Sequence, residues 1–167
     1  MVDKIRIAVI YSPEFAFLRQ DFRDNTLYYF FMHALKRNSR LYVEFFSARD
    51  KFDASVLKQK FDVIILPDNR FPHIPYELTS IKETNIPVIS RTGDPHTIKQ
   101  YDKLKIHESH QIKYYFGPMT ADYFHKFFPK ELKFKFIMAG LEPDLYKNIK
   151  PFSKRISEKI LNTGNVG

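Results

Sequence analysis

The residues best suited to chemistry follow an apolar run in the second half of the chain. Residues 86–96 read IPVISRTGDPH, a strand-like half followed abruptly by polar and turn-forming residues. Asp94 and His96 supply a carboxylate and an imidazole, which can orient hydroxyls and relay protons. We therefore expect Asp94 and His96 at a ligand site. Asp94 is equally suited to cap a helix that starts at Pro95, and the two roles are compatible.

The position of this segment in the chain gives the reason to expect a ligand there. By our count residues 86–90 form the fourth strand, and in open α/β sheets ligands bind beyond the carboxyl ends of strands. In the usual doubly wound order the fourth strand lies beside the first. The loop after Ser90 would then face the loop after Tyr11 across a crevice.

The composition limits the class of protein. The chain has 167 residues, enough for a domain with a core, and 44% of them are hydrophobic. It contains no Cys, and no apolar run is long enough to span a membrane. We expect a cytoplasmic location. The formal net charge is +8, but the Lys and Arg residues are scattered and form no nucleic-acid motif, so we expect no nucleic-acid partner.

Apolar strand-like segments alternate with helical patterns along most of the chain. The expected strands are 4–11, 41–46, 61–66, 86–90, 113–116 and 134–138, and the expected helices are 27–35, 53–57, 75–83, 95–104 and 119–128. This alternation predicts an α/β fold, a Rossmann-like three-layer sandwich with a mainly parallel sheet. The loop 68–75 carries Asn69, Arg70 and His73.

The sequence argues against a dinucleotide cofactor and against a metal ion. The segment after the first strand, 12–25, contains no Gly, so the dinucleotide fingerprint is missing. His107 and His110 lie close together with Glu108 between them, but they lack the set of ligands that a metal needs. We expect solvated histidines, no metal and no cofactor.

The end of the sequence changes character. Residues 147–155 are rich in Lys and Arg and resemble a linker, and residues 157–167 begin a strand and a Gly turn again. We expect one Rossmann-like domain over 1–147, followed at 148–167 by a linker and the start of a second domain.

The order of elements and the segment GLEPDLY at 140–146 resemble the N-terminal half of glycosyltransferases with the GT-B fold. Many retaining members leave that domain through Gly-Val-Asp-x-x-x-Phe, and Glu142 stands here in place of the Asp. The tail at 160–167 is similar to the opening strand and Gly loop of the second domain. There is no Gly-Gly pair after the first strand, and the given sequence lacks the donor-binding domain.

The resemblance implies an acceptor-binding half of an enzyme that transfers a sugar from a nucleotide-sugar donor. It implies catalytic roles for Asp94 and His96 and a sugar or lipid-linked acceptor, with the donor bound mainly by the second domain. The residues expected to bind substrate are Ser12, Glu14, Arg91, Thr92, Gly93 and Glu142. Residues 1–167 alone are expected to be inactive. The alternative is a stand-alone flavodoxin-like binding or regulatory domain.

A last pattern concerns membranes. Within 120–135, four aromatic residues fall on one helical stripe and are accompanied by lysines. They are Tyr123, Phe124, Phe127 and Phe128. Aromatic side chains beside lysines suit peripheral contact with an anionic bilayer. The same stripe also suits the core face of an ordinary helix with a solvated rim.

Overall fold

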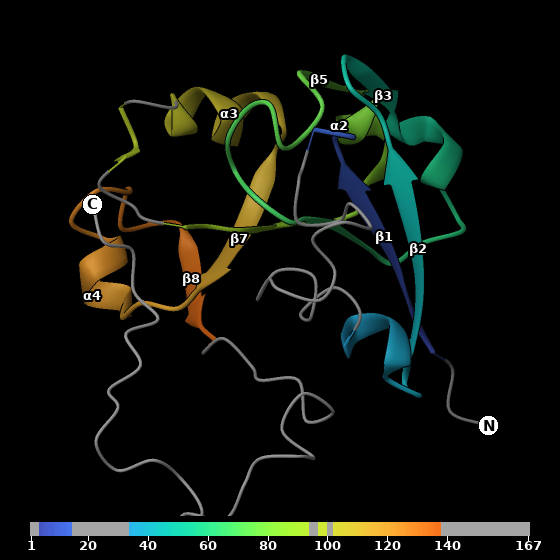
Figure 1. The fold of residues 1–167 in the computed structure, drawn as a ribbon, viewed down its shortest axis with the longest axis horizontal. Coiled ribbons are helices and arrows are strands. Elements are labelled where there is room, and N and C mark those ends of the chain that lie inside the picture. Colours follow the sequence, from blue (N-terminus) through green and yellow to red (C-terminus); the bar gives the residue numbers. More distant parts are fainter. Residues whose placement is uncertain (1–3, 15–33, 94–96, 100–101, 138–167) are drawn as a thin grey trace, which may run out of the picture.

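A six-stranded parallel sheet forms the centre of the molecule (Figure 1). The structure is a computed structural model that describes residues 4–14, 34–93, 97–99 and 102–137. The sheet order is β2-β1-β4-β6-β7-β8, and all five pairings are parallel. The strands are β1 (Ile5–Tyr11), β2 (Leu41–Ser47), β4 (Val63–Leu66), β6 (Val88–Arg91), β7 (Ile112–Gly117) and β8 (Lys133–Phe136). The predicted α/β fold with a mainly parallel sheet is confirmed.

Short elements cover this sheet. A second, two-stranded parallel sheet pairs β3 with β5. The other described elements include β3 (Lys51–Asp53), η3 (Ala54–Leu57, a 3-10 helix), β5 (Glu77–Thr79), α2 (Ile81–Thr84), α3 (Lys103–Ser109) and α4 (Ala121–Phe124). Asp53 caps η3, because its side chain accepts a hydrogen bond from the amide of Ser55.

Strand β1 is apolar on both faces because both faces are covered. Ala8 and Ile10 belong to a large core that also contains side chains from η3, α2, α3 and α4. Ile7 and Val9 belong to a smaller cluster on the other face, against which Leu35 of the helical residues 34–37 packs. A strand buried on both sides needs a continuous apolar run rather than alternation, and the sequence of β1 has one.

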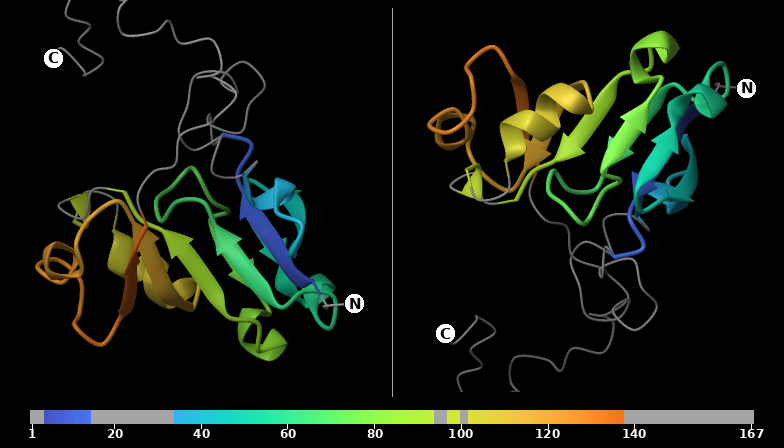
Figure 2. Two further views of the ribbon diagram at one scale, coloured as in Figure 1. Left: turned by 90° about the horizontal axis from the view of Figure 1, so that it is seen from below. Right: turned by 90° about the horizontal axis from the view of Figure 1, so that it is seen from above.

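The strand order differs from the expected one. The third main strand, β4, lies beside β1, and β6 pairs with β4 and β7 instead of β1. The chain therefore reverses its direction of travel across the sheet between β1 and β4, as in the flavodoxin-like order. All six strands end at the same edge (Figure 2). The crevice at the switch point is thus bordered by the loops after β1 and β4, and the prediction that placed the loop after Ser90 opposite Tyr11 is wrong.

Three predicted helices are also wrong in extent. Within 95–104, α3 begins only at Lys103 and continues to Ser109. Within 75–83, residues Glu77–Thr79 form β5, and the helix α2 begins only at Ile81. Tyr76 and Glu77 donate backbone hydrogen bonds to Arg49 and Asp50, so pairing with β3 overrides the local helix signal. Within 119–128, the α-helix α4 covers only Ala121–Phe124.

Gly117 lets the ends of β6 and β7 approach closely. A Cβ placed on Gly117 would lie 2.6 Å from the carbonyl oxygen of Thr92, whereas one on Gly93 would meet no heavy atom within 4 Å. We predict that Gly117→Ala lowers the free energy of unfolding by about 1–3 kcal/mol, because backbone must move to relieve the clash. Gly93→Ala is the matched control and should change it by less than about 0.5 kcal/mol. Urea unfolding measures both, and equal effects of the two substitutions would contradict this packing.

Candidate ligand site at the switch point

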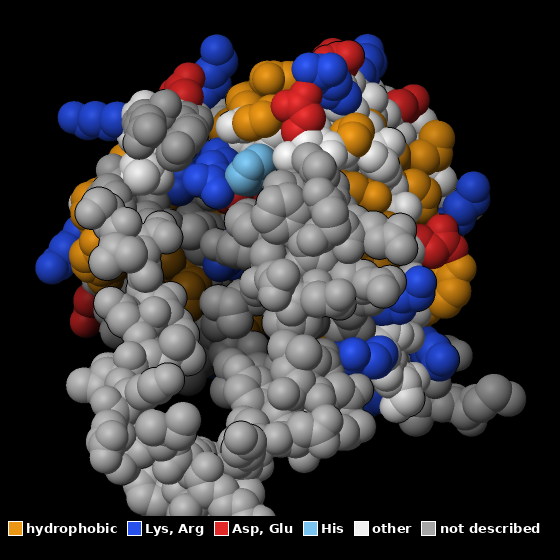
Figure 3. Space-filling view, in the orientation of Figure 1, with side chains coloured by type: hydrophobic (Ala, Val, Ile, Leu, Met, Phe, Trp, Pro, Cys, Tyr) orange, Lys and Arg blue, Asp and Glu red, His pale blue; other side chains and the backbone are white. Residues whose placement is uncertain are grey.

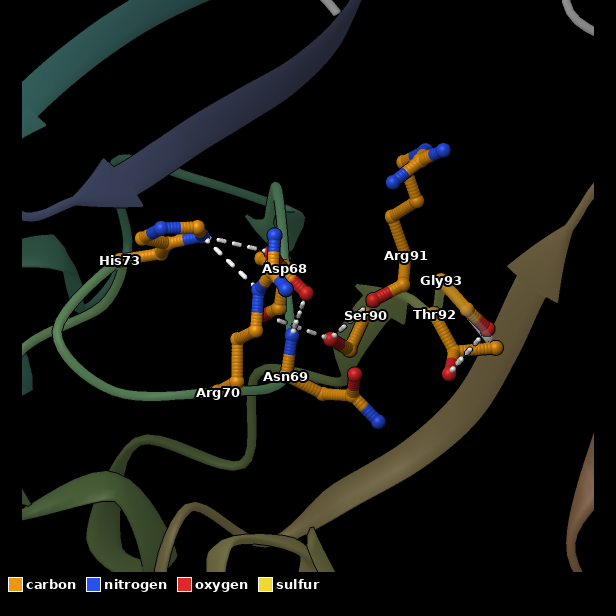
Figure 4. A network of polar contacts seen from close by, with 8 residues as sticks. All are labelled: Asp68, Asn69, Arg70, His73, Ser90, Arg91, Thr92 and Gly93. Carbon is orange, nitrogen blue, oxygen red and sulfur yellow. Dashed lines mark hydrogen bonds and ion pairs between the residues drawn. The ribbon is translucent and has the colours of Figure 1, made fainter. Parts of the chain in front are cut away.

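A network of polar side chains fills the loop that follows β4 (Figure 4). The carboxylate of Asp68 is only 4% exposed. Its Oδ2 lies 2.8 Å from Nε of Arg70 and 2.7 Å from Nδ1 of His73. Its Oδ1 accepts a hydrogen bond of 2.8 Å from the backbone amide of Asn69. Three donors therefore converge on one buried carboxylate.

These donors determine the charge of Asp68 and the tautomer of His73. Burial by itself raises the pKa of the Asp68 carboxyl, but the hydrogen bond from His73, the charges of Arg70 and His73, and the Asn69 amide outweigh it, so its pKa lies below the ordinary value. An ionised carboxylate only accepts hydrogen bonds. A hydrogen bond to this carboxylate needs the proton on Nδ1 of His73, so Nε of Arg70, 3.2 Å from that nitrogen, cannot then donate to it and donates to Asp68 alone. Nε2 is the acceptor nitrogen of that neutral tautomer. This is the arrangement of an oriented imidazole base.

Two neighbouring elements hold the loop in place. The backbone amide of Ser12, after β1, donates to the carbonyl oxygen of His73 at 2.9 Å. His110, at the end of α3, lies 2.8 Å through Nε2 from the carbonyl oxygen of Pro75. The contact with Ser12 joins the loops on the two sides of the switch point.

His110 is fully buried, so the expectation that it is solvated is wrong. Its ring packs against Phe71 and its backbone closes α3, and burial lowers its pKa. His107 lies 3.2 Å through Nδ1 from the hydroxyl of Tyr115. Both histidines thus have structural partners.

The end of β6 borders the same network. The hydroxyl of Ser90 lies 3.1 Å from the carbonyl oxygen of Asp68, to which it can donate. The backbone amide of Thr92 donates to the carbonyl oxygen of Phe116 on β7, and Thr92 is fully buried. The side chain of Arg91 points away from Asp68 (Figure 4). The carboxyl ends of β4, β6 and β7 are therefore one connected edge.

The residues predicted to bind substrate are brought together only in part. Ser12 is buried beside the loop after β4, and its hydroxyl accepts a hydrogen bond from the amide of Glu14. The carboxylate of Glu14 forms an ion pair of 2.6 Å with Arg49. The residues Arg91, Thr92 and Gly93 extend from β6 at the same edge. The predicted residues Asp94, His96 and Glu142 lie outside the described residues.

The site also contains residues that the sequence-based argument did not select: Asp68, Asn69, Arg70 and His73. The sequence did place them in one polar loop after an apolar strand. The correct strand order would have turned that loop into the first candidate, since β4 and not β6 borders β1. In Figure 3, a histidine side chain and Lys or Arg side chains are adjacent on this face of the molecule.

Other parts of the described chain contain cavities, the larger ones of about 460 Å³ and about 730 Å³, the latter lined by Lys4, Arg6, Tyr42 and Asp62. No group of three or more His, Cys, Asp or Glu suited to a metal ion occurs among the residues that the structure describes. A cavity of about 460 Å³ lies at the opposite edge of the sheet, near the start of β7 and β8; its lining residues include His107, Glu108, Lys113, Glu131 and Lys133. Its charged groups face open surface and form no network comparable to that of Asp68. Within the described segments, no helix has the length and apolar character needed to cross a bilayer.

Comparison with protein-family models, with curated proteins and with solved structures found no match to this chain.

We predict that Asp68→Asn lowers the free energy of unfolding at pH 7 by about 2–3 kcal/mol, because it leaves the His73 and Arg70 donors without their buried anion. Asp62→Asn is the matched control: Asp62 forms an exposed ion pair of 2.7 Å with Arg6, so its loss should cost less than about 1 kcal/mol. Chemical denaturation measures both.

The contribution of Asp68 to the free energy of unfolding also depends on pH. Because the pKa of Asp68 is lower in the folded protein, its stabilisation is complete above the ordinary carboxyl pKa and is lost as the pH falls below about 4. Asp68→Asn should reduce that acid-induced loss. Equal costs for the Asp68 and Asp62 substitutions would contradict a buried, paired Asp68.

Proposed function

We propose that the chain is the acceptor-binding half of a glycosyltransferase that takes its sugar from a nucleotide-sugar donor. The observation that carries this proposal is the network of Asp68, Arg70 and His73 at the switch point of a parallel sheet. In open α/β sheets this is where ligands bind. The donor would be held mainly by a second domain, and the acceptor is a sugar or a lipid-linked sugar.

The chemistry of sugar transfer fits these groups. An acceptor hydroxyl must be positioned and relieved of its proton, and the leaving diphosphate must be neutralised. His73 is oriented by Asp68 with Nδ1 as donor, so its Nε2 is suited to accept a proton. Arg70 adds a fixed positive charge 2.8 Å from the same carboxylate.

The sequence adds support from two other segments. Asp94 directly follows Gly93, and the resemblance assigns Asp94 and His96 to the region of the transferred sugar. The segment 140–146, with Glu142, resembles the exit from the N-terminal domain of GT-B enzymes. These assignments belong to the proposal, together with the substrate-binding role of Arg91.

A second candidate function is a stand-alone flavodoxin-like binding or regulatory domain. The observation that favours it is the strand order β2-β1-β4-β6-β7-β8, which has the flavodoxin-like reversal beside β1. The coding sequence after Gly167 separates the two candidates. A further ~150–200 residues with a second Rossmann-like pattern favour the transferase, and a stop codon favours the stand-alone domain.

The proposed function is tested by turnover. In the polypeptide that carries both domains, we predict that His73→Gln, Asp94→Asn and His96→Ala each lower nucleotide-sugar-dependent transfer by about 10²-fold or more, the range typical of acid–base groups. Melting temperatures of the Asp94 and His96 variants should stay nearly unchanged. Transfer is measured as nucleoside diphosphate release with and without a sugar acceptor.

The outcomes for Asp94 separate its two roles. If Asp94→Asn lowers stability by about 1 kcal/mol while turnover is intact, Asp94 is a helix cap only. Full activity of all three variants would contradict the proposed function. Residues 1–167 alone should show no turnover, since the donor-binding domain is then missing.

Peripheral membrane contact is a further part of the proposal. Phe124 and Phe128 are buried in the core, so half of the aromatic stripe serves packing. Tyr123 remains 39% exposed, and Nζ of Lys126 lies 5.8 Å from the centre of its ring. Of the four aromatic residues of the stripe, Tyr123 and the partly buried Phe127 remain available to a bilayer, with Lys126 beside them.

We predict that co-sedimentation with vesicles containing anionic lipid decreases on combining Tyr123→Ser with Lys126→Gln, and decreases in high salt, which screens the lysine charge. Tyr42→Ser is the control, because Tyr42 is 47% exposed on β2, the edge strand opposite β8. Co-sedimentation that neither the paired substitution nor salt affects would remove the membrane role.

A further inference from the structure

One buried side chain at the switch point lacks the hydrogen bonds that its neighbours have. Asn69 is fully buried, and neither Oδ1 nor Nδ2 of its carboxamide has a hydrogen-bond partner. The backbone amide of the same residue is satisfied by Asp68. The unmet groups are thus confined to the side chain, which carries one acceptor and two donor hydrogens.

The contrast with the other buried polar side chains at this edge is sharp. Ser12, Asp68, Ser90 and Thr92 each form a side-chain hydrogen bond. A buried amide that has lost water and gained no partner is costly, and native proteins keep few of them. The protein therefore carries at Asn69 an unmet donor and acceptor in the same loop as the network of Asp68.

Figure 4 shows where this carboxamide points. The side chain of Asn69 leaves the loop on the side away from Arg70 and His73. Because Ser90 contacts the carbonyl oxygen of Asp68, Asn69 lies where the ends of β4 and β6 meet. At the end of β6 a Cβ on Gly93 would meet no heavy atom within 4 Å.

We infer that the carboxamide of Asn69 binds two adjacent hydroxyls of a carbohydrate. Oδ1 accepts a hydrogen bond from one hydroxyl, and Nδ2 donates to the oxygen of its neighbour. A simple anion would satisfy only Nδ2, and a cation only Oδ1. Adjacent hydroxyls satisfy both, since each hydroxyl donates and accepts. The inference rests on the proposed sugar-binding function and deepens it, because it makes Asn69 the residue that selects among acceptors.

The edge of adenine also presents a paired donor and acceptor that Asn can bind. The surroundings of Asn69 favour the carbohydrate. The next aromatic ring in the loop, Phe71, already packs on Tyr76 with ring centres 4.6 Å apart and on His110 at 5.9 Å. The packed ring of Phe71 offers a base no stacking partner, whereas hydroxyls need none. Adenosine is therefore a competing outcome of the test.

The test measures binding by saturation-transfer NMR and calorimetry with methyl glycosides of glucose, galactose and mannose, and with adenosine. For the glycoside that binds wild type best, Asn69→Leu should weaken binding by about tenfold or more, the loss expected for two hydrogen bonds. Asn38→Leu is the control, because Asn38 lies before β2 at the other edge and its Oδ1 accepts from the amide of Arg40. It should leave binding unchanged.

Deoxy analogues of that glycoside test the same contact without any substitution. Removal of either of two adjacent hydroxyls should weaken binding to wild type about three- to tenfold, and should have less than a twofold effect on Asn69→Leu. Deoxy analogues that lose nothing in wild type would overturn the inference.

The melting temperature of the ligand-free protein separates ligand binding from a structural role for Asn69. Asn69→Leu replaces an unsatisfied amide with an apolar group of similar size, so the melting temperature should stay equal or rise. A clear fall would mean that the amide is paired within the protein and would overturn the inference. Equal glycoside binding by wild type and Asn69→Leu would also overturn the inference, although sugar binding itself would stand. A substitution that weakens only adenosine binding would overturn it as well. Absence of any glycoside binding by wild type would instead contradict the proposed function, and the inference would fall with it.

Discussion

The candidate site depends on one buried carboxylate, that of Asp68, which needs hydrogen-bond donors around it. Asp68 can remain charged at 4% exposure only because an amide, a guanidinium and an imidazole converge on it. An unpaired charge at that depth would cost several kcal/mol, of order 3–5 when one partner of a buried pair is removed. The loop after β4 therefore has one conformation in which Arg70 and His73 are both directed at Asp68. Ser12 and His110 fix the backbone of that loop from the two elements beside it.

The same constraint connects local chemistry to the topology of the sheet. The carboxylate lies where it does because β4 inserts between β1 and β6, which puts its carboxyl end at the switch point. Gly117 and Thr92 bring β7 against β6 at the same edge. Hydrogen bonds and a close backbone contact thus join the ends of β4, β6 and β7, while the charged residues that line the cavity of about 460 Å³ at the opposite edge form no comparable network.

Much of this fold could be predicted from the sequence, and its arrangement could not. The apolar runs that include Ile7, Val9 and Ile64 indicate buried strands, because hydrophobicity is a property of each segment alone. Which strand lies beside which depends on the whole chain. The strand order expected from the sequence therefore placed β6 beside β1 incorrectly. For the same reason Pro75 indicated a helix where Glu77–Thr79 pairs with β3, and His110 could not be recognised as buried without Pro75 and Phe71 above it. The polar loop with Asn69, Arg70 and His73 was visible, but only the strand order gives it significance.

We propose that ligands bind at the switch point between β1 and β4. The most direct test of this proposal is a titration of ¹⁵N-labelled protein with the tightest-binding methyl glycoside, followed through the backbone amide resonances. Binding at the switch point should give the largest shift changes at Ser12, at residues 69–71, at His73 and at Gly93. Changes concentrated at Lys113 and Glu131, beside the cavity at the other edge of the sheet, would contradict it.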